Sequence, residues 1–157
     1  MDKLIQLLDS NARLNDAQLA VMLDRTEEEV KAQIASLERE GVIRGFKAVI
    51  DWEKTDRDTL TALIELRVTP QPDRGFEEIA EQISLFDEVE SVYLMSGGYD
   101  LAVTVRGRSF RDIAFFVAKQ LSTLDSVIST ATHFVLRRYK DQGVAFTREK
   151  KDLRGAL

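Results

Sequence analysis

Residues 96–100, with the sequence Ser-Gly-Gly-Tyr-Asp, have the composition of a loop that can bind a charged small molecule. Glycines leave backbone amides uncovered, so these amides can donate hydrogen bonds to a carboxylate. An aspartate can accept hydrogen bonds from an ammonium group. Such a loop suits a zwitterion, although glycine and aspartate are also ordinary turn residues and a glycine pair can serve a tight hairpin. The residues of this candidate loop are Gly97, Gly98, Tyr99 and Asp100.

Catalytic and metal-binding chemistry has little support in the sequence. His133 is the only histidine, and no serine or cysteine nucleophile is visibly arranged for it. No HExxH, P-loop or GxGxxG pattern occurs. The absence of cysteine excludes disulfides, thiolate metal sites and a cysteine nucleophile. We therefore predict that the protein is not an enzyme and that it uses no cofactor or metal ion.

Composition and charge favour a soluble protein of the cytoplasm. Of the 157 residues, 44% are apolar and 31% are charged, and the net charge is −5. This charge argues against a surface that attracts nucleic acid along its whole length, but it leaves room for a local basic patch. No apolar run approaches the roughly 20 residues that cross a bilayer, and the first residues lack an apolar signal core. We expect no membrane partner.

The first forty residues contain three short segments with apolar side chains at helical spacing. The third has the clearest boundaries, because Thr26 and Glu29 form a capping box and Gly41 can turn left-handed after the last residue. Only Asp24 and Arg25 separate it from the second segment, and Asp tolerates the unusual backbone angle of such a turn. Two helices with so short a connection, supported by a third, predict a helix-turn-helix. A plain three-helix core is the alternative.

The hydrophobic period changes in the second part of the chain. Residues 60–68 alternate between apolar and polar side chains, as a strand with one buried face does. The order strand, helix, strand, strand, helix, strand then predicts a ferredoxin-like unit, in which both helices cover one face of a four-stranded antiparallel sheet. The later segments are a helix around 76–83, strands at 89–95 and 101–105, a helix from 109 to 121 and a strand at 127–136.

The complete fold that we predict is α+β with two domains. The uncovered face of the sheet predicts self-association, because small proteins seldom expose a broad apolar surface. Phe115 falls opposite Val117 on its helix, which fits self-association or a single exposed aromatic ring. The predicted boundaries are a helix-turn-helix domain at 1–51 that ends in a strand at 46–51, a linker at 52–58, a ferredoxin-like domain at 59–147 and a tail at 148–157 without an assigned role.

Three stretches carry a resemblance to a known family. They are residues 37–46 (LEREGVIRGF), residues 93–105 (YLMSGGYDLAVTV) and residues 124–140 (LDSVISTATHFVLRRYK). With the front helices, they resemble the Lrp/AsnC family of transcription regulators in order and spacing over nearly the whole chain. The resemblance implies an N-terminal winged helix-turn-helix that binds double-stranded DNA and a connecting strand used in dimer formation. It also implies a C-terminal ferredoxin-like ligand domain, an amino-acid effector bound between subunits, and homodimers that assemble into tetramers or octamers.

The same resemblance assigns effector-binding positions. The family's ligand loop falls on Gly97, Gly98, Tyr99 and Asp100, and its threonines in the last strand resemble Thr130 and Thr132. Gly98 stands where the family often has an acidic residue, so the identity of the effector does not follow from the loop.

The charges of the front helices fit DNA poorly. Residues 1–50 carry seven Lys and Arg against nine Asp and Glu, a net −2, whereas DNA affinity depends largely on neutralising phosphates. We predict a DNA-binding regulator strengthened by oligomerisation, because both domains are present and linked as in the family. The alternative is an effector-binding or assembly protein that binds DNA weakly or only through partners. The acidic run at 27–29 favours this alternative. The candidate DNA contacts are Arg25, Glu28, Lys31, Ser36, Arg39, Arg44 and Lys47.

Overall fold

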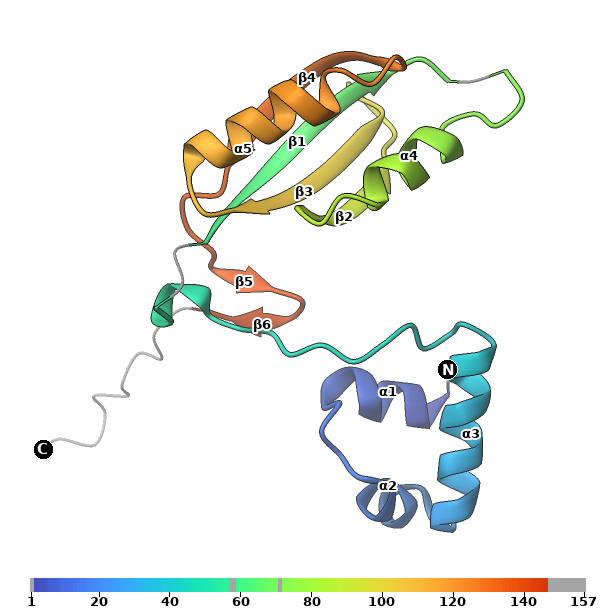
Figure 1. Ribbon diagram of the computed structural model, residues 1–157. Coiled ribbons are helices and arrows are strands. Elements are labelled where there is room, and N and C mark those ends of the chain that lie inside the picture. Colours follow the sequence, from blue (N-terminus) through green and yellow to red (C-terminus); the bar gives the residue numbers. More distant parts are fainter. Residues whose placement is uncertain (1, 57–58, 71, 147–157) are drawn as a thin grey trace, which may run out of the picture. The chain divides into compact units, whose positions relative to one another are not determined.

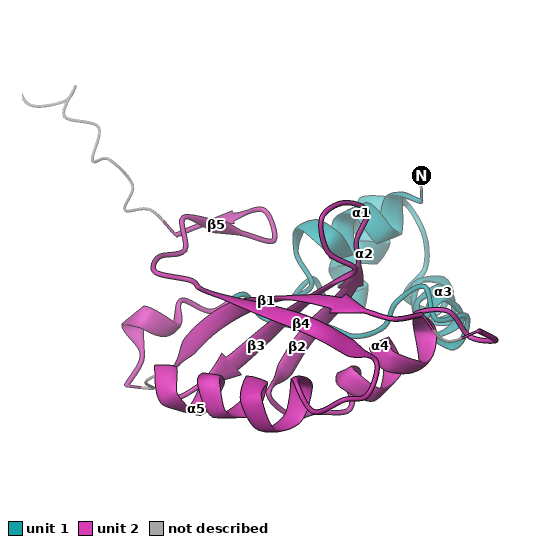
Figure 2. Cartoon of the chain, turned by 90° about the horizontal axis from the view of Figure 1, so that it is seen from above, with its two compact units in different colours: residues 1–49 teal, residues 50–157 magenta. Residues whose placement is uncertain are grey.

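The computed structural model describes residues 2–56, 59–70 and 72–146 of the chain (Figure 1). The chain divides into two compact units, residues 1–49 and residues 50–157 (Figure 2). Part of the expected linker, residues 57–58, and the expected tail at 148–157 lie outside the described residues. Within the described ranges, each helix is too short or too polar to cross a bilayer.

Unit 1 consists of three helices around a small apolar core. Helix α1 spans Lys3–Ser10, α2 spans Asp16–Leu23 and α3 spans Glu27–Arg39. Each helix begins at a side-chain cap, because free N–H groups at a helix start need acceptors. The buried residues of this core are Leu4, Leu8, Leu19, Ala20 and Val30.

The turn between α2 and α3 has the predicted geometry. Asp24 lies in the left-handed region at φ 54° and ψ 53°, and the Arg25 backbone N–H donates to the Ala20 carbonyl at 3.0 Å. Thr26 and Glu29 then form the capping box: the Thr26 N–H donates to Glu29 Oε2 at 2.9 Å, and the Glu29 N–H donates to Thr26 Oγ1 at 3.2 Å. The helix-turn-helix geometry therefore follows from local hydrogen bonds.

Helix α3 ends as predicted, but the segment after it does not form the expected strand. Gly41 has φ +72°, and the N–H groups of Gly41 and Val42 donate to the carbonyls of Glu38 and Leu37 at 3.1 and 2.9 Å, which is a Schellman end. Residues 43–51 then form no strand. The predicted strand at 46–51 is therefore wrong for the single chain, and the described part of unit 1 has no wing. A strand needs the backbone of a partner strand, and none of the residues that the structure describes pairs with this segment.

The sheet of unit 2 has the predicted ferredoxin-like topology. Strands β1 (Leu60–Val68), β2 (Val89–Leu94), β3 (Leu101–Gly107) and β4 (Val127–Phe134) pair antiparallel in the order β2-β3-β1-β4. Helix α4 spans Glu77–Ser84, and α5 (Phe110–Phe116) continues as a π-helical turn, η2 (Val117–Leu121). Both helices cover the same side of the sheet (Figure 2).

The core of unit 2 lies between the sheet and these helices. Along β1, the side chains alternate as predicted: Ala62, Ile64, Leu66 and Val68 are buried, whereas Leu63 is half-buried on the open face. The Phe86 and Phe116 rings meet edge to face at 5.4 Å between centroids. Phe115 is 45% exposed and Val117 only 7%, so the predicted outward position of Phe115 is confirmed.

Three further features differ from the expectation. The last strand of the sheet ends at Phe134 instead of Leu136. The expected linker contains a short 3-10 helix, η1 (Trp52–Lys54), and a small hairpin of β5 (Lys140–Asp141) and β6 (Val144–Ala145) follows the sheet. Gln142 and Gly143 make the hairpin turn with φ of 45° and 81°, a pattern that suits such a short connection.

Candidate DNA-binding and effector-binding sites

Arg25 belongs to a chain of polar contacts that joins the α2–α3 turn, α3 and the start of α1. Its Nη1 donates to Gln33 Oε1 on α3, and Gln33 Nε2 donates to Asp2 Oδ2 at the start of α1 at 2.5 Å. Both hydrogen bonds are exposed on the surface. Arg25 is therefore placed at the start of α3 by its neighbour Gln33, a residue that the sequence analysis did not single out.

Three more of the candidate DNA contacts have partners within unit 1. Lys31 Nζ lies 4.0 Å from Asp16 Oδ2, Ser36 Oγ donates to Glu40 Oε1 at 2.7 Å, and Arg39 Nε donates to the Ala35 carbonyl at 3.3 Å. Exposed contacts of this kind contribute little to stability. They can therefore be exchanged for contacts to phosphate without a large cost to the fold.

The remaining candidates, Glu28, Arg44 and Lys47, are exposed. Among the described residues, their side chains have no hydrogen bond or ion pair. The Arg44 guanidinium lies over Gly41, where an added Cβ would be 3.2 Å from Arg44 Cζ. Arg44 and Lys47 are thus free cations on the segment that follows α3.

The first turn of α3 is acidic and exposed. Glu27, Glu28 and Glu29 stand at the positive end of the helix dipole. The backbone N–H of Thr26 donates to the Glu29 carboxylate, and this hydrogen bond holds the pKa of Glu29 below its ordinary value. A negative first turn repels phosphate, although a glutamate can accept a hydrogen bond from a cytosine amine.

The candidate binding loop is longer than a glycine hairpin. Leu94 pairs with Leu101 in the sheet, and the Met95 N–H donates to the Asp100 carbonyl at 2.8 Å, so four residues remain as the tip. Gly97 has φ +146°, which side chains rarely adopt, and Gly98 does not have a positive φ. A Cβ at either glycine would have no neighbouring atom within 4 Å. The backbone at the tip is therefore uncovered, which is the property that the binding hypothesis requires.

Asp100 has a structural role that the sequence did not reveal. Its Oδ2 accepts a hydrogen bond from the Val68 N–H at 2.9 Å, and its own N–H donates to the Leu66 carbonyl at 2.9 Å. The pairing of β1 with β4 shifts register between Arg67 and Val68. The Asp100 carboxylate thus satisfies an amide at an irregular strand end, and its second oxygen has no partner among the described residues.

The two candidate threonines lie on a different strand from the loop. Thr130 pairs with Leu66 and Thr132 with Ile64, so both side chains share the helix-covered face and both are half-buried. Strand β1 separates β4 from β3, and this places the threonines about 10 Å from the strand that follows the loop. Within one chain, the loop and the threonines therefore lie on strands that are not neighbours in the sheet.

A helix-turn-helix unit followed in the same chain by an antiparallel α+β unit defines a class of two-domain regulators. A model of the Lrp/AsnC ligand binding domain matches residues 61–145. The chain belongs to the Lrp/AsnC family.

Known relatives are similar to this chain over nearly its whole length. The uncharacterized HTH-type transcriptional regulator YugG of Bacillus subtilis is 48% identical over 97% of this chain and 92% of the relative. The crystal structure of the Mycobacterium tuberculosis leucine response regulatory protein has a TM-score of 0.74 at 23% identity, with 90% of this chain and 97% of that chain covered. A Neisseria meningitidis regulator, NMB0573, in complex with L-Met has a TM-score of 0.71 at 23% identity, with 90% and 93% covered.

The two kinds of comparison support different statements. The structural likeness shows a shared fold, whereas the family match and the relative names show transcription regulators. The prediction that the chain is not an enzyme is confirmed by this family membership.

Proposed function

We propose that the protein is an oligomeric transcription regulator that binds double-stranded DNA through α3 and an amino acid or related small molecule through its C-terminal unit. The observation that carries the proposal is the α2–α3 turn, in which the left-handed Asp24 and the Thr26–Glu29 cap leave the outer side of α3 exposed. In a helix-turn-helix protein, the start of the second helix enters the major groove.

The proposed DNA interface has few cations for each copy. Glu28 and Ser36 face base edges, and Arg25, Lys31 and Arg39 contact phosphates or bases after releasing their partners within the chain. Arg44 and Lys47 extend the contact beyond α3. Because each copy neutralises few phosphates, affinity depends on joining several copies, which raises the effective concentration of each helix at its half-site.

The proposed effector site uses two subunits. The tip formed by Gly97, Gly98 and Tyr99 supplies uncovered amides for a carboxylate, and the free oxygen of Asp100 accepts from an ammonium group. Thr130 and Thr132 of a neighbouring subunit complete the site, since those of the same chain are about 10 Å away across β1. The neisserial regulator with L-Met is consistent with an amino-acid effector.

The homodimer forms across the open face of the sheet. Leu63 and Ala131 lie on that face beside Glu65 and His133, whose Oε1 and Nε2 atoms are 3.3 Å apart. The segment at 46–51 pairs with no strand among the described residues of its own chain, and it gains a partner strand from the second subunit. We expect these dimers to assemble further into tetramers or octamers, as the resemblance to the Lrp/AsnC family implies.

A second function is favoured by one specific observation. Glu27, Glu28 and Glu29 are all exposed at the helix end that would approach DNA. A protein with this surface can keep the regulator architecture as an effector-binding assembly and act on DNA only through a partner.

A mobility-shift titration separates the two functions. The full-length protein is titrated at moderate salt into a labelled fragment of DNA from upstream of its own gene, with an excess of unrelated DNA as competitor. The proposal predicts a specific shift that a screen of the twenty amino acids can modulate. If an oligomer forms and binds an amino acid but gives no specific shift, the second function is correct.

A further inference from the structure

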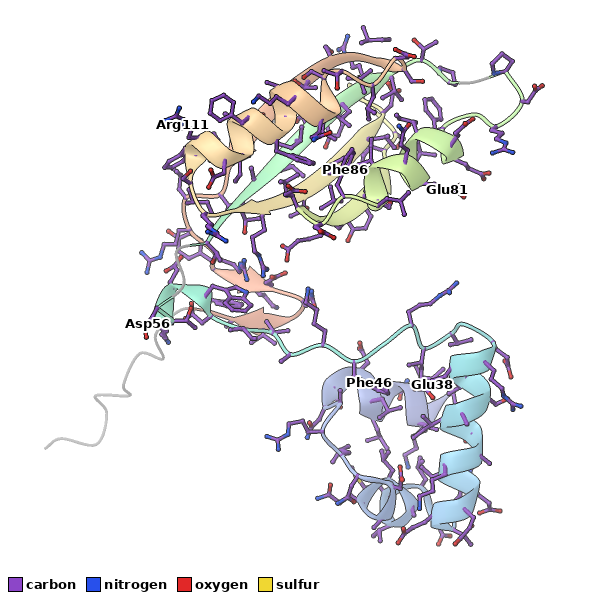
Figure 3. All side chains as sticks on the ribbon, in the orientation of Figure 1. Glu38, Phe46, Asp56, Glu81, Phe86 and Arg111 are labelled. Atoms are coloured by element: carbon purple, nitrogen blue, oxygen red, sulfur yellow. The ribbon has the colours of Figure 1, made fainter. Side chains whose placement is uncertain are left out.

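A cavity of about 290 Å³, which we call the η1 cavity, lies at the end of the sheet where β1 begins. It is lined by η1 and the residue before it, by the start of β1, by residues 135–138 after β4, and by Phe146 after the β5–β6 hairpin. Figure 3 shows the side chains of η1, near the label of Asp56, next to those of the hairpin. The volume is at the lower end of the range for small-molecule sites, about 300–1,000 Å³. The cavity therefore suits one compact ligand.

The η1 cavity is separate from the candidate effector loop. Leu60 belongs to its lining, whereas Asp100 of the loop bonds to Val68 at the other end of β1. The strand between them has nine residues, and at a rise of about 3.3 Å per residue its ends are about 26 Å apart. A ligand in the η1 cavity therefore does not contact the loop of the same chain.

Two aromatic rings belong to the lining of the η1 cavity. Trp52 is half-buried, and the Arg106 guanidinium carbon lies 4.9 Å from the centre of its ring. Phe146 is also half-buried, and the Arg138 guanidinium carbon lies 5.3 Å from the centre of its ring. Aromatic side chains at the border of a cavity offer flat apolar surfaces for stacking. These rings favour a flat aromatic ligand.

The charges of the lining balance. Arg137 and Arg138 supply guanidinium groups, and Asp51 and Glu53 supply carboxylates. A ligand with a net charge of either sign would therefore meet as much repulsion as attraction. A neutral ring that both donates and accepts hydrogen bonds fits this lining better.

Arg138 and Asp51 are the two best placed of these polar groups, because their side chains are only 24% and 27% exposed. Each has one ion-pair partner among the described residues. Arg138 Nη1 lies 3.3 Å from Asp141 Oδ2, and Asp51 Oδ2 lies 3.3 Å from Lys54 Nζ. A guanidinium has further N–H groups and a carboxylate has a second oxygen. Both side chains can therefore bind a ligand without giving up these partners.

We propose that the η1 cavity binds the guanine base of a nucleoside or nucleotide. Guanine presents two neighbouring acceptors, O6 and N7, which a guanidinium binds as a pair, and it also has an amine donor. Arg138 donates to the two acceptors, and Asp51 accepts from the amine. Trp52 and Phe146 border the faces of the base. Adenine has a donor beside N7, so it cannot accept from both arms of the guanidinium.

Trp52 makes binding directly measurable, because it is the only tryptophan of the chain. Guanosine is titrated into the full-length protein while Trp52 emission is recorded, and free tryptophan amide in a parallel titration corrects for light that the nucleoside absorbs. We expect a saturable change with guanosine and binding of adenosine that is about tenfold weaker or more. Guanosine monophosphate distinguishes the two sources of the base, because a phosphate at the entrance would pair with the exposed Arg137 and tighten binding.

Two variants separate the guanidinium from the fold of the hairpin. Arg138→Gln removes the charged donor and is expected to weaken guanosine binding about tenfold or more. Asp141→Asn breaks the same ion pair but keeps the guanidinium, so it is expected to bind guanosine as well as the unmodified protein. Calorimetric titration of each variant detects binding that leaves the emission unchanged, and circular dichroism shows whether the fold persists.

The proposal is overturned if neither emission nor calorimetry detects saturable guanosine binding, or if adenosine binds equally well. It is also overturned if Asp141→Asn weakens binding as much as Arg138→Gln, because the effect would then come from the hairpin and not from the guanidinium. The comparison of the two nucleosides uses the unmodified protein, so it holds even if a variant does not fold. These results depend neither on DNA binding nor on amino-acid binding.

Discussion

Asp100 accepts a hydrogen bond from the backbone N–H of Val68 at 2.9 Å and thereby joins the candidate effector loop to the end of the central strand β1. The bond spans 32 residues of sequence. One carboxylate oxygen thus holds the loop in place, and the other is available to a ligand. The effects of Asp100 on ligand binding and on the stability of unit 2 can be separated by comparing two different substitutions of this residue.

Asp100→Asn is expected to remove amino-acid binding while it preserves the fold. The amide oxygen of Asn can still accept from Val68, but the negative charge that attracts an ammonium group is lost. Asp100→Ala, in contrast, leaves a partly buried N–H without an acceptor and should lower the free energy of unfolding by about 1–3 kcal/mol. Calorimetric titration and chemical unfolding measure the two effects. Undiminished binding by Asp100→Asn would reject the proposed role of the carboxylate.

Arg25→Ala and Arg39→Ala are each expected to weaken binding to the protein's upstream DNA while the oligomer persists. Each lost phosphate contact should reduce the slope of log affinity against log salt by about 1. Gln33→Ala is the matched control for Arg25, because it removes the neighbour that holds the guanidinium but keeps the charge. A salt slope that is the same for Arg25→Ala and the unmodified protein would contradict the assignment.

The cap at Glu29 is expected to make the stability of unit 1 depend on pH in the acidic range. The hydrogen bond from Thr26 lowers the pKa of Glu29 in the folded state, so the cap contributes stability above the ordinary pKa and loses it as the pH falls through the lowered value. Glu29→Gln can keep the hydrogen bond without the titration. The difference in melting temperature between the two proteins should therefore change below about pH 4.5, and a difference that is constant with pH would contradict the role of Glu29.

Gly107→Ala is expected to destabilise unit 2, whereas Gly98→Ala should leave its stability nearly unchanged. A Cβ on Gly107 would lie 2.7 Å from Ile113 Cγ1, but a Cβ on Gly98 would meet nothing within 4 Å. Overpacking of this kind costs about 1–3 kcal/mol. Urea unfolding of the two variants measures the contrast. Equal stability would show that α5 moves away from β3 without cost.

The sequence by itself determined the local elements, because their signals act over a few residues. The Thr26–Glu29 cap, the left-handed Asp24, the turn at Gly41 and the alternation along β1 all depend on neighbours close in the chain. The ferredoxin-like order followed from these elements, and the uncovered backbone at Gly97 and Gly98 followed from the missing side chains.

The tertiary structure decided what depends on distant residues. Hydrogen bonds in the folded units join Asp100 to Val68 and Gln33 to Asp2. Strand β1 lies between Thr130 on β4 and the strand β3 that follows the loop. The tertiary structure also left residues 46–51 without strand pairing, although their composition predicted a strand. The physical reason is the same in each case: a hydrogen bond or a strand pair needs a second group at the right distance, and the position of that group is set by the packing of the whole unit.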